Sequence, residues 1–158
     1  MASYTLSESE RCYLKNRAHQ RAEFLKRKER ILHPASVDIG SNWEAFAAEH
    51  LRKQGYEIWE RNYRGSRGEI DLVANKGTQI VFVEVKARTS AQFGMPYEAI
   101  GRKKRQAMIR TAEEYLVKRD LLTGWDIRYD AASILAPKGE PPRMDYFEDV
   151  FRVEEEFY

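Results

Sequence analysis

The sequence Gly68-Glu69-Ile70-Asp71, followed by Val83-Glu84-Val85-Lys86, decides the fold expected for this chain. Both stretches belong to segments rich in Val, Ile and Phe, residues 70–75 and 79–88, which predict two β-strands. The residues that link them, Asn75-Lys76-Gly77-Thr78, have the composition of a tight turn. The sequence therefore predicts a β-hairpin.

The alternation of side chains along the second strand places three residues on one face. Successive side chains of a strand point to opposite faces, so Phe82, Glu84 and Lys86 share a face. If the loop has an even number of residues, Asp71 lies on that face too. A four-residue loop would put Phe82 opposite Asp71 and Glu84 on the adjacent diagonal, roughly 7 Å away. An odd loop would break this arrangement unless a β-bulge restored the register.

Two carboxylates brought this close require a nearby positive charge. At about 5 Å they repel by roughly 3 kcal/mol at an effective dielectric constant near 20. The cation could be Lys86, a divalent metal ion, or both. Mg²⁺ binds carboxylates, water and phosphate oxygens, and it can polarise a phosphodiester and lower the pKa of an attacking water. The alternative is a surface ladder of salt bridges among Asp71, Glu84 and Lys86, worth less than about 1 kcal/mol, and spacing alone favours this ladder.

Further residues form an ordered series around the hairpin. They are Glu44-x-x-Ala47-Ala48-x-x-Leu51, Gly55-Tyr56, Arg61-Asn62-x-Arg64, Gly68-Glu69-Ile70-Asp71-Leu72, Val81-Phe82-Val83-Glu84-Val85-Lys86-x-Arg88, Phe93-Gly94-x-Pro96-x-Glu98-Ala99, Lys104 and Arg128-Tyr129-Asp130. An aspartate, a Glu-x-Lys on the next strand and a glutamate on a preceding helix resemble the PD-(D/E)XK nuclease pattern. The full series is similar to one branch of it, the YraN-type family of predicted nucleases, over roughly residues 40–151.

This resemblance implies a metal site and a reaction. Asp71, Glu84 and the Val85 carbonyl would hold Mg²⁺ or Mn²⁺. Lys86 would assist the attacking water, and Glu44 would complete the site or bind a second metal ion. The implied reaction is endonucleolytic hydrolysis of phosphodiesters in DNA. A branched or damaged DNA substrate is suggested only by analogy with junction-resolving members of the superfamily.

Glu44 has two interpretations from its place in a predicted helix, residues 42–54. Ser41 and Glu44 fit a capping box, in which the glutamate closes the start of the helix. Helical periodicity also places Glu44 on the inward side with Ala47 and Leu51, from which its carboxylate could reach a metal on the sheet. The resemblance favours the second interpretation.

A second helix is predicted from Pro96 to about Arg119, with an inward stripe in which Lys104 lies near the N-terminal end. Lys104 could face the catalytic cleft and bind a phosphate, or extend along the helix edge with its ammonium in water. Arg64 and Arg88 are the other candidates for phosphate contacts.

The remaining segments complete an α/β fold. Strands are predicted over residues 56–64, 125–135 and 146–151. Helix, three strands, helix and two strands form a restriction-endonuclease-like three-layer sandwich with a mixed central β-sheet, which the resemblance also implies. Asp130 could support the active site or pair with Arg128 or Arg110. Glu69, next to the site in sequence, is interpreted as structural.

The length of 158 residues predicts one domain with an appendage. We expect an N-terminal basic helical extension, residues 1–39, and a nuclease-like domain, residues 40–158. Residues 7–32 predict a charged helix that must pack on the domain, on a second copy of the chain or on nucleic acid. Packing within or between protomers is favoured, so a homodimer through this helix or a sheet edge is one expectation.

The composition indicates which cellular compartment and which binding partners to expect. No apolar run reaches membrane-spanning length, and no signal peptide is recognised, so a cytoplasmic protein without a membrane partner is expected. A single cysteine excludes an internal disulfide. A net charge of +2 does not by itself indicate nucleic acid, but basic clusters at residues 61–67, 102–105 and 15–30 could hold phosphates, although such runs are more often solvated faces.

Three functions are therefore open from the sequence. The preferred one is a metal-dependent endonuclease acting on DNA. The second is a non-catalytic nucleic-acid-binding or assembly protein on the same scaffold, with its carboxylates paired to arginines. The third is a structural partner protein without affinity for nucleic acid, even at low salt.

Overall fold

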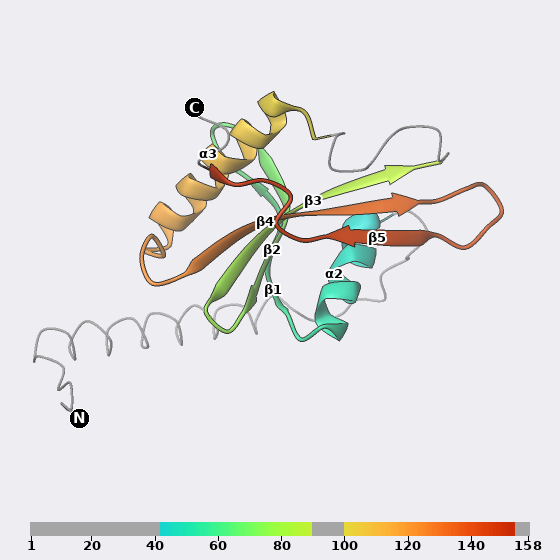
Figure 1. Cartoon of the computed structure of the whole chain (residues 1–158), viewed down its shortest axis with the longest axis horizontal. Coiled ribbons are helices and arrows are strands. Elements are labelled where there is room, and N and C mark those ends of the chain that lie inside the picture. The colour runs from blue at the N-terminus through green and yellow to red at the C-terminus, as the bar shows by residue number, and fades with distance from the viewer. Residues whose placement is uncertain (1–41, 90–99, 154–158) are drawn as a thin grey trace, which may run out of the picture. The chain divides into compact units, whose positions relative to one another are not determined.

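In the part of the chain that the structure describes, a five-stranded sheet carries one helix on each face (Figure 1). The computed structural model describes residues 42–89 and 100–153, all within the unit spanning residues 38–158. The strands are β1 (Glu57–Arg64), β2 (Glu69–Lys76), β3 (Gln79–Arg88), β4 (Asp126–Leu135) and β5 (Arg143–Phe147), and the helices are α2 (Trp43–Lys53) and α3 (Arg102–Lys118). This is the predicted α/β class with a mixed sheet, consistent with a restriction-endonuclease-like fold.

The strands lie in the sheet in their order along the chain. β1, β2 and β3 are antiparallel neighbours, as are β4 and β5. β3 and β4 are parallel, and α3 connects them, because a parallel pair needs a crossover. The predicted strand–helix–strand unit is therefore present in the middle of the fold.

The hairpin loop between β2 and β3 is shorter than predicted. Lys76 pairs with Gln79, so the loop is Gly77-Thr78 and the predicted four-residue loop is wrong. Gly77 adopts a φ of 60°, which suits a tight hairpin turn. The Asn75 side-chain amide donates hydrogen bonds to the carbonyls of Gly77 (3.2 Å) and Gln79 (2.8 Å), and so stabilises the turn. The loop is still even, so the face assignment of Asp71 holds.

The two faces of the sheet bury different side chains. On one face, Leu51 of α2 packs in a cluster with Leu72 of β2 and Val83 of β3. On the other face, Tyr115 of α3 meets Phe82 of β3 edge to face, with ring centroids 5.7 Å apart. The odd-numbered residues of β3 therefore face α2 and the even-numbered residues face α3, as the alternation predicts.

The start of α3 and the position of β5 differ from the prediction. The helix begins at Arg102 after the N-cap Gly101, and Ile100 is not helical, so the predicted continuous helix from Pro96 is wrong. Pro96 itself lies outside the described residues. β5 occupies Arg143–Phe147, three residues earlier than the start predicted at residue 146.

The turn between β1 and β2 is fixed to α3 by Glu114. Its carboxylate accepts hydrogen bonds from the backbone N–H (2.7 Å) and hydroxyl (2.8 Å) of Ser66. A Cβ atom on the neighbouring Gly65 would lie 2.9 Å from Glu114 Oε2 and 3.0 Å from Thr111 Cγ2. The absence of a side chain at Gly65 thus lets this turn pack closely against the helix, which positions the start of β2.

The predicted N-terminal extension, residues 1–39, with its helix over residues 7–32 and its proposed role in a homodimer, lies outside the described residues. Within the described part of the chain, neither helix combines the length and the apolar character that a bilayer crossing requires.

Candidate active site

The candidate site lies where β2 separates from β3. The pairing of these strands ends at Leu72 and Val83, although β2 continues to pair with β1 as far as Glu69. Asp71 is the next residue beyond Leu72, and Glu84 is the next beyond Val83. Continued by one residue past the last pair, this register sets Asp71 against Glu84 rather than against Phe82, which the predicted four-residue loop would have placed there.

The Asp71 side chain contacts β3 at the position where the backbone pairing of the two strands has ended. Its Oδ2 accepts a hydrogen bond of 2.7 Å from the backbone N–H of Val85. This contact satisfies a β3 donor and fixes the carboxylate against the strand that carries Glu84. Val85 thus adjoins Asp71 through its N–H, whereas its carbonyl as a metal ligand stays a prediction.

Glu84 is a buried acid with one cationic neighbour. The residue is 8% exposed, and its Oε2 lies 2.8 Å from Nζ of Lys104 on α3. This contact is an ion pair by distance but not an aligned hydrogen bond, because Oε2 has no hydrogen-bond donor in the structure. We therefore treat the pair as electrostatic. Oε2 is a buried oxygen with unused capacity to accept a ligand.

The pKa of the Asp71 carboxyl is raised in the folded protein. Burial, the largest effect, raises this pKa from 3.8 to about 6. The hydrogen bond from Val85 lowers this pKa, the charge of Glu84 raises it, that of Lys104 lowers it, and that of Glu44 raises it. Burial therefore outweighs the stabilising contacts of the Asp71 carboxylate.

The position of Glu44 follows from the start of α2. The N-cap is Asn42, whose Oδ1 accepts hydrogen bonds from the N–H of Ala45 (3.0 Å) and from Arg61 Nη2 (2.9 Å). The predicted capping box between Ser41 and Glu44 is therefore wrong. Arg61 ties the N-terminal end of α2 to β1, and Glu44 on the first turn acts on Asp71 through its charge.

Lys86 lies two residues beyond Glu84 on β3 and therefore on the same face of the strand. Its side chain is exposed, and it forms no ion pair with residues 42–89 or 100–153. An exposed amine on the strand face that carries Glu84 is available to a molecule that approaches from solvent.

The candidate phosphate-binding residues have different surroundings. The side chain of Arg64 is 83% exposed and lies 3.6 Å from Glu69, an exposed pair worth little. Glu69 thus contacts Arg64 at the surface rather than the carboxylates. Arg88 ends β3 and is partly exposed. Lys104 contacts Glu84 instead of pointing along the helix edge, a contact that helical periodicity alone did not indicate.

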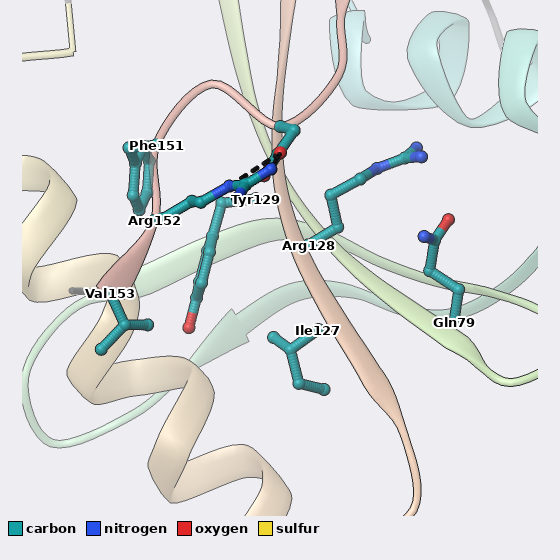
Figure 2. Close-up of a pocket in the computed structure, with 8 residues that line it drawn as sticks. Gln79, Ile127, Arg128, Tyr129, Phe151, Arg152 and Val153 are labelled. Atoms are coloured by element: carbon teal, nitrogen blue, oxygen red, sulfur yellow. Dashed lines mark hydrogen bonds and ion pairs between the residues drawn. The ribbon is translucent and has the colours of Figure 1, made fainter. Parts of the chain in front are cut away.

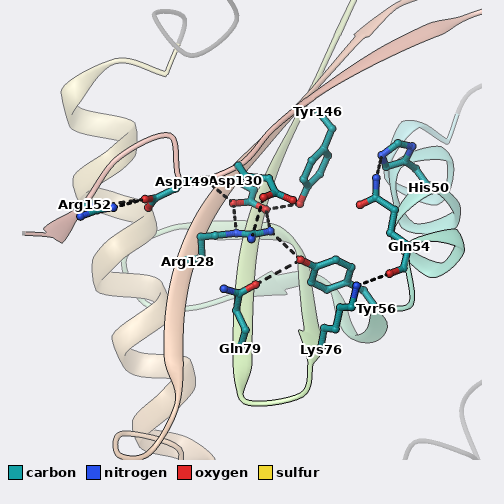
Figure 3. A network of polar contacts seen from close by, with 11 residues as sticks. His50, Gln54, Tyr56, Lys76, Gln79, Arg128, Asp130, Tyr146, Asp149 and Arg152 are labelled. Carbon is teal, nitrogen blue, oxygen red and sulfur yellow. Dashed lines mark hydrogen bonds and ion pairs between the residues drawn. The ribbon is translucent and has the colours of Figure 1, made fainter.

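A second polar cluster surrounds Asp130 (Figure 3). Asp130 is fully buried and accepts hydrogen bonds from Arg128 Nε (2.8 Å) and Nη2 (2.7 Å), Tyr146 Oη (2.6 Å) and the N–H of Asp149 (3.0 Å). Arg128 also donates to Tyr56 Oη at 3.0 Å. Asp130 therefore pairs with Arg128 rather than Arg110, and these contacts occupy its oxygens. Its role is to join β4 to β5.

A pocket of about 420 Å³ opens beside β4 (Figure 2). Its lining consists of Gln79, Ile127, Arg128, Tyr129, Asp149, Phe151, Arg152 and Val153. Arg152 pairs with Asp149 at 2.7 Å, and Arg128 pairs with Asp130. The cations of this pocket are balanced by carboxylates, so it offers no excess charge for an anion.

The residues of the candidate site fit a hard divalent cation. Nowhere in residues 42–89 or 100–153 do three or more His, Cys, Asp or Glu side chains gather as a metal site. Mg²⁺, however, is usually bound by one or two carboxylates and keeps several waters. Asp71 and Glu84 supply that number of carboxylates, although Lys104 lies against one oxygen of Glu84.

Comparison with known proteins places this chain in a family. The model of the family described as "Uncharacterised protein family UPF0102" matches residues 43–134. A UPF0102 protein of Alkaliphilus metalliredigens is 39% identical over 116 residues, which cover 73% of this chain and 99% of the relative. One of Dictyoglomus turgidum is 43% identical over 115 residues, which cover 72% and 97%. The chain therefore belongs to the UPF0102 family, which is the YraN family that its sequence resembles.

Proposed function

We propose that this protein is a metal-dependent endonuclease that hydrolyses phosphodiesters of DNA with Mg²⁺ or Mn²⁺. The observation that supports the proposal is that Asp71 and Glu84 both directly follow the last β2–β3 pair, with Asp71 hydrogen-bonded to the N–H of Val85 next to Glu84. A divalent ion bound there would polarise the phosphodiester and lower the pKa of an attacking water. Asp71, Glu84 and the Val85 carbonyl are its proposed ligands.

The side chains around these ligands have separate proposed roles. Lys86 is exposed on the face of Glu84, where its ammonium can orient the attacking water and balance negative charge on the phosphorus oxygens. Glu44 adds a third carboxylate within electrostatic reach of Asp71 and would complete the site or hold a second ion. Burial of Glu84 keeps competing water from its carboxylate.

The proposed substrate is bound through its phosphates. Arg64, Arg88 and Lys104 supply cations on β1, β3 and α3, and phosphate contacts of this kind carry no sequence preference. A branched or damaged DNA substrate rests on analogy with junction-resolving proteins of similar fold.

The direct test is a cleavage assay on linear, nicked and four-way-junction DNA with Mg²⁺ or Mn²⁺. We expect cleavage that EDTA abolishes and that Lys86→Ala slows by about 100-fold or more, because a group that assists the attacking water is lost. Lys103→Ala is the matched control, since it removes an exposed lysine outside the carboxylate cluster. Cleavage that persists in EDTA, or equal rates for Lys86→Ala and wild type, would contradict the proposal.

The ion pair between Lys104 and Glu84 favours one alternative, a nucleic-acid-binding protein that does not cleave. In that case the carboxylate is already neutralised and needs no metal. The same assay separates the two functions, because such a protein would bind each DNA in a salt-dependent manner and cut none of them.

A further inference from the structure

We propose that Lys104 is a resident cation that occupies Glu84 until a divalent metal displaces it, and that the released lysine then binds a phosphate of the nucleic acid. The proposal rests on the metal-dependent function proposed above. It adds a competitor, built into α3, that couples metal binding at the sheet to nucleic-acid binding at the helix.

The geometry makes Lys104 a competitor for a metal ion at the Glu84 carboxylate. Lys104 Nζ lies 2.8 Å from Glu84 Oε2, and the two side chains are 36% and 11% exposed. A divalent ion on either oxygen of this carboxylate would lie roughly 2.0–2.6 Å from that oxygen and close to the ammonium. The two cations would repel each other at close range, so metal binding favours release of the lysine.

The start of α3 gives Lys104 few other partners. The first turn contains four consecutive cations, Arg102 to Arg105, and no acidic residue, and the N-cap Gly101 supplies no side-chain hydrogen bond. Positive side chains are unfavourable at the positive end of the helix dipole. Arg105 Nη1 donates to the carbonyl of Ile100 at 3.2 Å, whereas Lys104 uses Glu84.

A lysine with one charge does not neutralise this site. The Lys104 ammonium carries one positive charge, whereas Asp71 and Glu84, which directly follow the last β2–β3 pair, can carry two negative charges. A divalent ion carries twice the charge and can contact Asp71 and Glu84 together. Replacement of the lysine by the metal therefore balances more of the negative charge, and it frees the Lys104 ammonium.

The freed lysine lies in the first turn of α3, which itself contains no acidic residue. Phosphate is the anion that this position suits, because helix N-terminal N–H groups and the dipole both favour it. Metal and nucleic acid should consequently strengthen each other's binding, since linkage between two sites is reciprocal.

The first test is calorimetric titration of Mn²⁺ into the full chain. Lys104→Met, which keeps an apolar stem of similar length, is expected to bind Mn²⁺ about tenfold more tightly than wild type, because the competitor is gone. Lys104→Gln serves as a second variant. Lys103→Met is the matched control, with the same change in net charge, and its Mn²⁺ affinity should stay within about twofold of wild type.

The second test is the salt dependence of DNA binding, measured by fluorescence anisotropy with a labelled duplex. All proteins carry Lys86→Ala, which is expected to slow cleavage by about 100-fold, and each measurement ends before cut DNA accumulates. With Mn²⁺, Lys104→Met should reduce the slope of log affinity against log salt concentration by about 1, because one phosphate contact is lost. With EDTA, the slope should not change, since Lys104 is then held by Glu84.

The outcomes distinguish this inference from the function on which it rests. If wild type binds Mn²⁺ and both Lys104 variants bind it no more tightly, the inference fails and the metal site stands. If neither wild type nor the variants bind Mn²⁺, the proposed function fails and the inference with it. Tighter Mn²⁺ binding by both Lys104 variants, with Lys103→Met unchanged, supports the exchange.

Discussion

Asp71→Asn is expected to abolish Mn²⁺ binding and, in the absence of metal, to make the protein more stable at pH 8 by about 1–3 kcal/mol. The pKa of Asp71 is raised from 3.8 to about 6, chiefly by burial. Asparagine carries no charge to desolvate, and its side-chain oxygen can still accept the hydrogen bond from the N–H of Val85. The lower end of the range allows for solvent screening at this half-buried group.

The pH dependence of this effect follows from the direction of the shift. Below the unfolded pKa of 3.8, the carboxyl is neutral in both states and costs nothing. As pH rises from 3.8 to about 6, the unfolded chain ionises first, so the wild type loses stability relative to Asp71→Asn. Above about pH 6 the difference is complete.

Urea denaturation in EDTA at pH 4 and pH 8 measures this difference. Asp145→Asn, a change at an exposed aspartate of β5, is the control and should leave stability nearly unaltered. A variant that is less stable than wild type at pH 8, or a gain of equal size at both pH values, would be inconsistent with a buried, charge-crowded Asp71.

Asp130→Asn is expected to destabilise the protein by about 3–5 kcal/mol, because it removes one partner of a buried ion pair. The side chain of Arg128 is only 14% exposed, and it would keep one carboxylate contact, with Glu148 at 3.2 Å, beside its hydrogen bond to Tyr56. The variant would also weaken the acceptor for Tyr146, at 2.6 Å, which joins β4 to β5. A loss of this size is a large fraction of the stability of an ordinary domain.

The free energy of unfolding in urea at pH 7 measures this loss. Glu140→Gln is the matched control, since it breaks an exposed ion pair with Arg143 whose side chains are 58% and 75% exposed. Such a pair contributes less than about 1 kcal/mol. A similarly small loss for Asp130→Asn would show that the cluster in Figure 3 does not stabilise the fold.

These two carboxylates illustrate opposite uses of burial. Asp130 is buried with four hydrogen bonds to its oxygens, so its charge is compensated and it holds two strands together. Asp71 is half-buried with one hydrogen bond and acidic neighbours, so its charge destabilises the folded state. Residues that lower the stability of the fold and make no compensating structural contacts are typical of functional sites.

The hairpin could be predicted from sequence because its signals are local. The alternation along β3 gave the correct faces, since the side-chain period of a strand is fixed. The loop length could not be predicted, because it depends on whether Asn75 and Lys76 pair or turn. The hydrogen bonds of the Asn75 amide across the turn favour pairing, and composition does not reveal them.

The contacts around the carboxylates could not be predicted from the sequence, because they join residues that are far apart in the chain. Asn42 and Ser41 are both good N-caps, and the choice between them is consistent with the hydrogen bond from Arg61 on β1 to Asn42. Helical periodicity placed Lys104 near the inward stripe but could not show that its ammonium reaches Glu84. A signal was present in the four cations of the first turn of α3, which lack an acidic neighbour in that turn.

The central claim, that Asp71 and Glu84 hold one divalent cation, is tested most directly by diffraction from crystals grown with MnCl₂, with data collected to record the anomalous signal of manganese. The account predicts an anomalous peak in contact with oxygens of both carboxylates, with Lys104 withdrawn from Glu84. A map without a peak between them, with Lys104 still paired to Glu84, would contradict it.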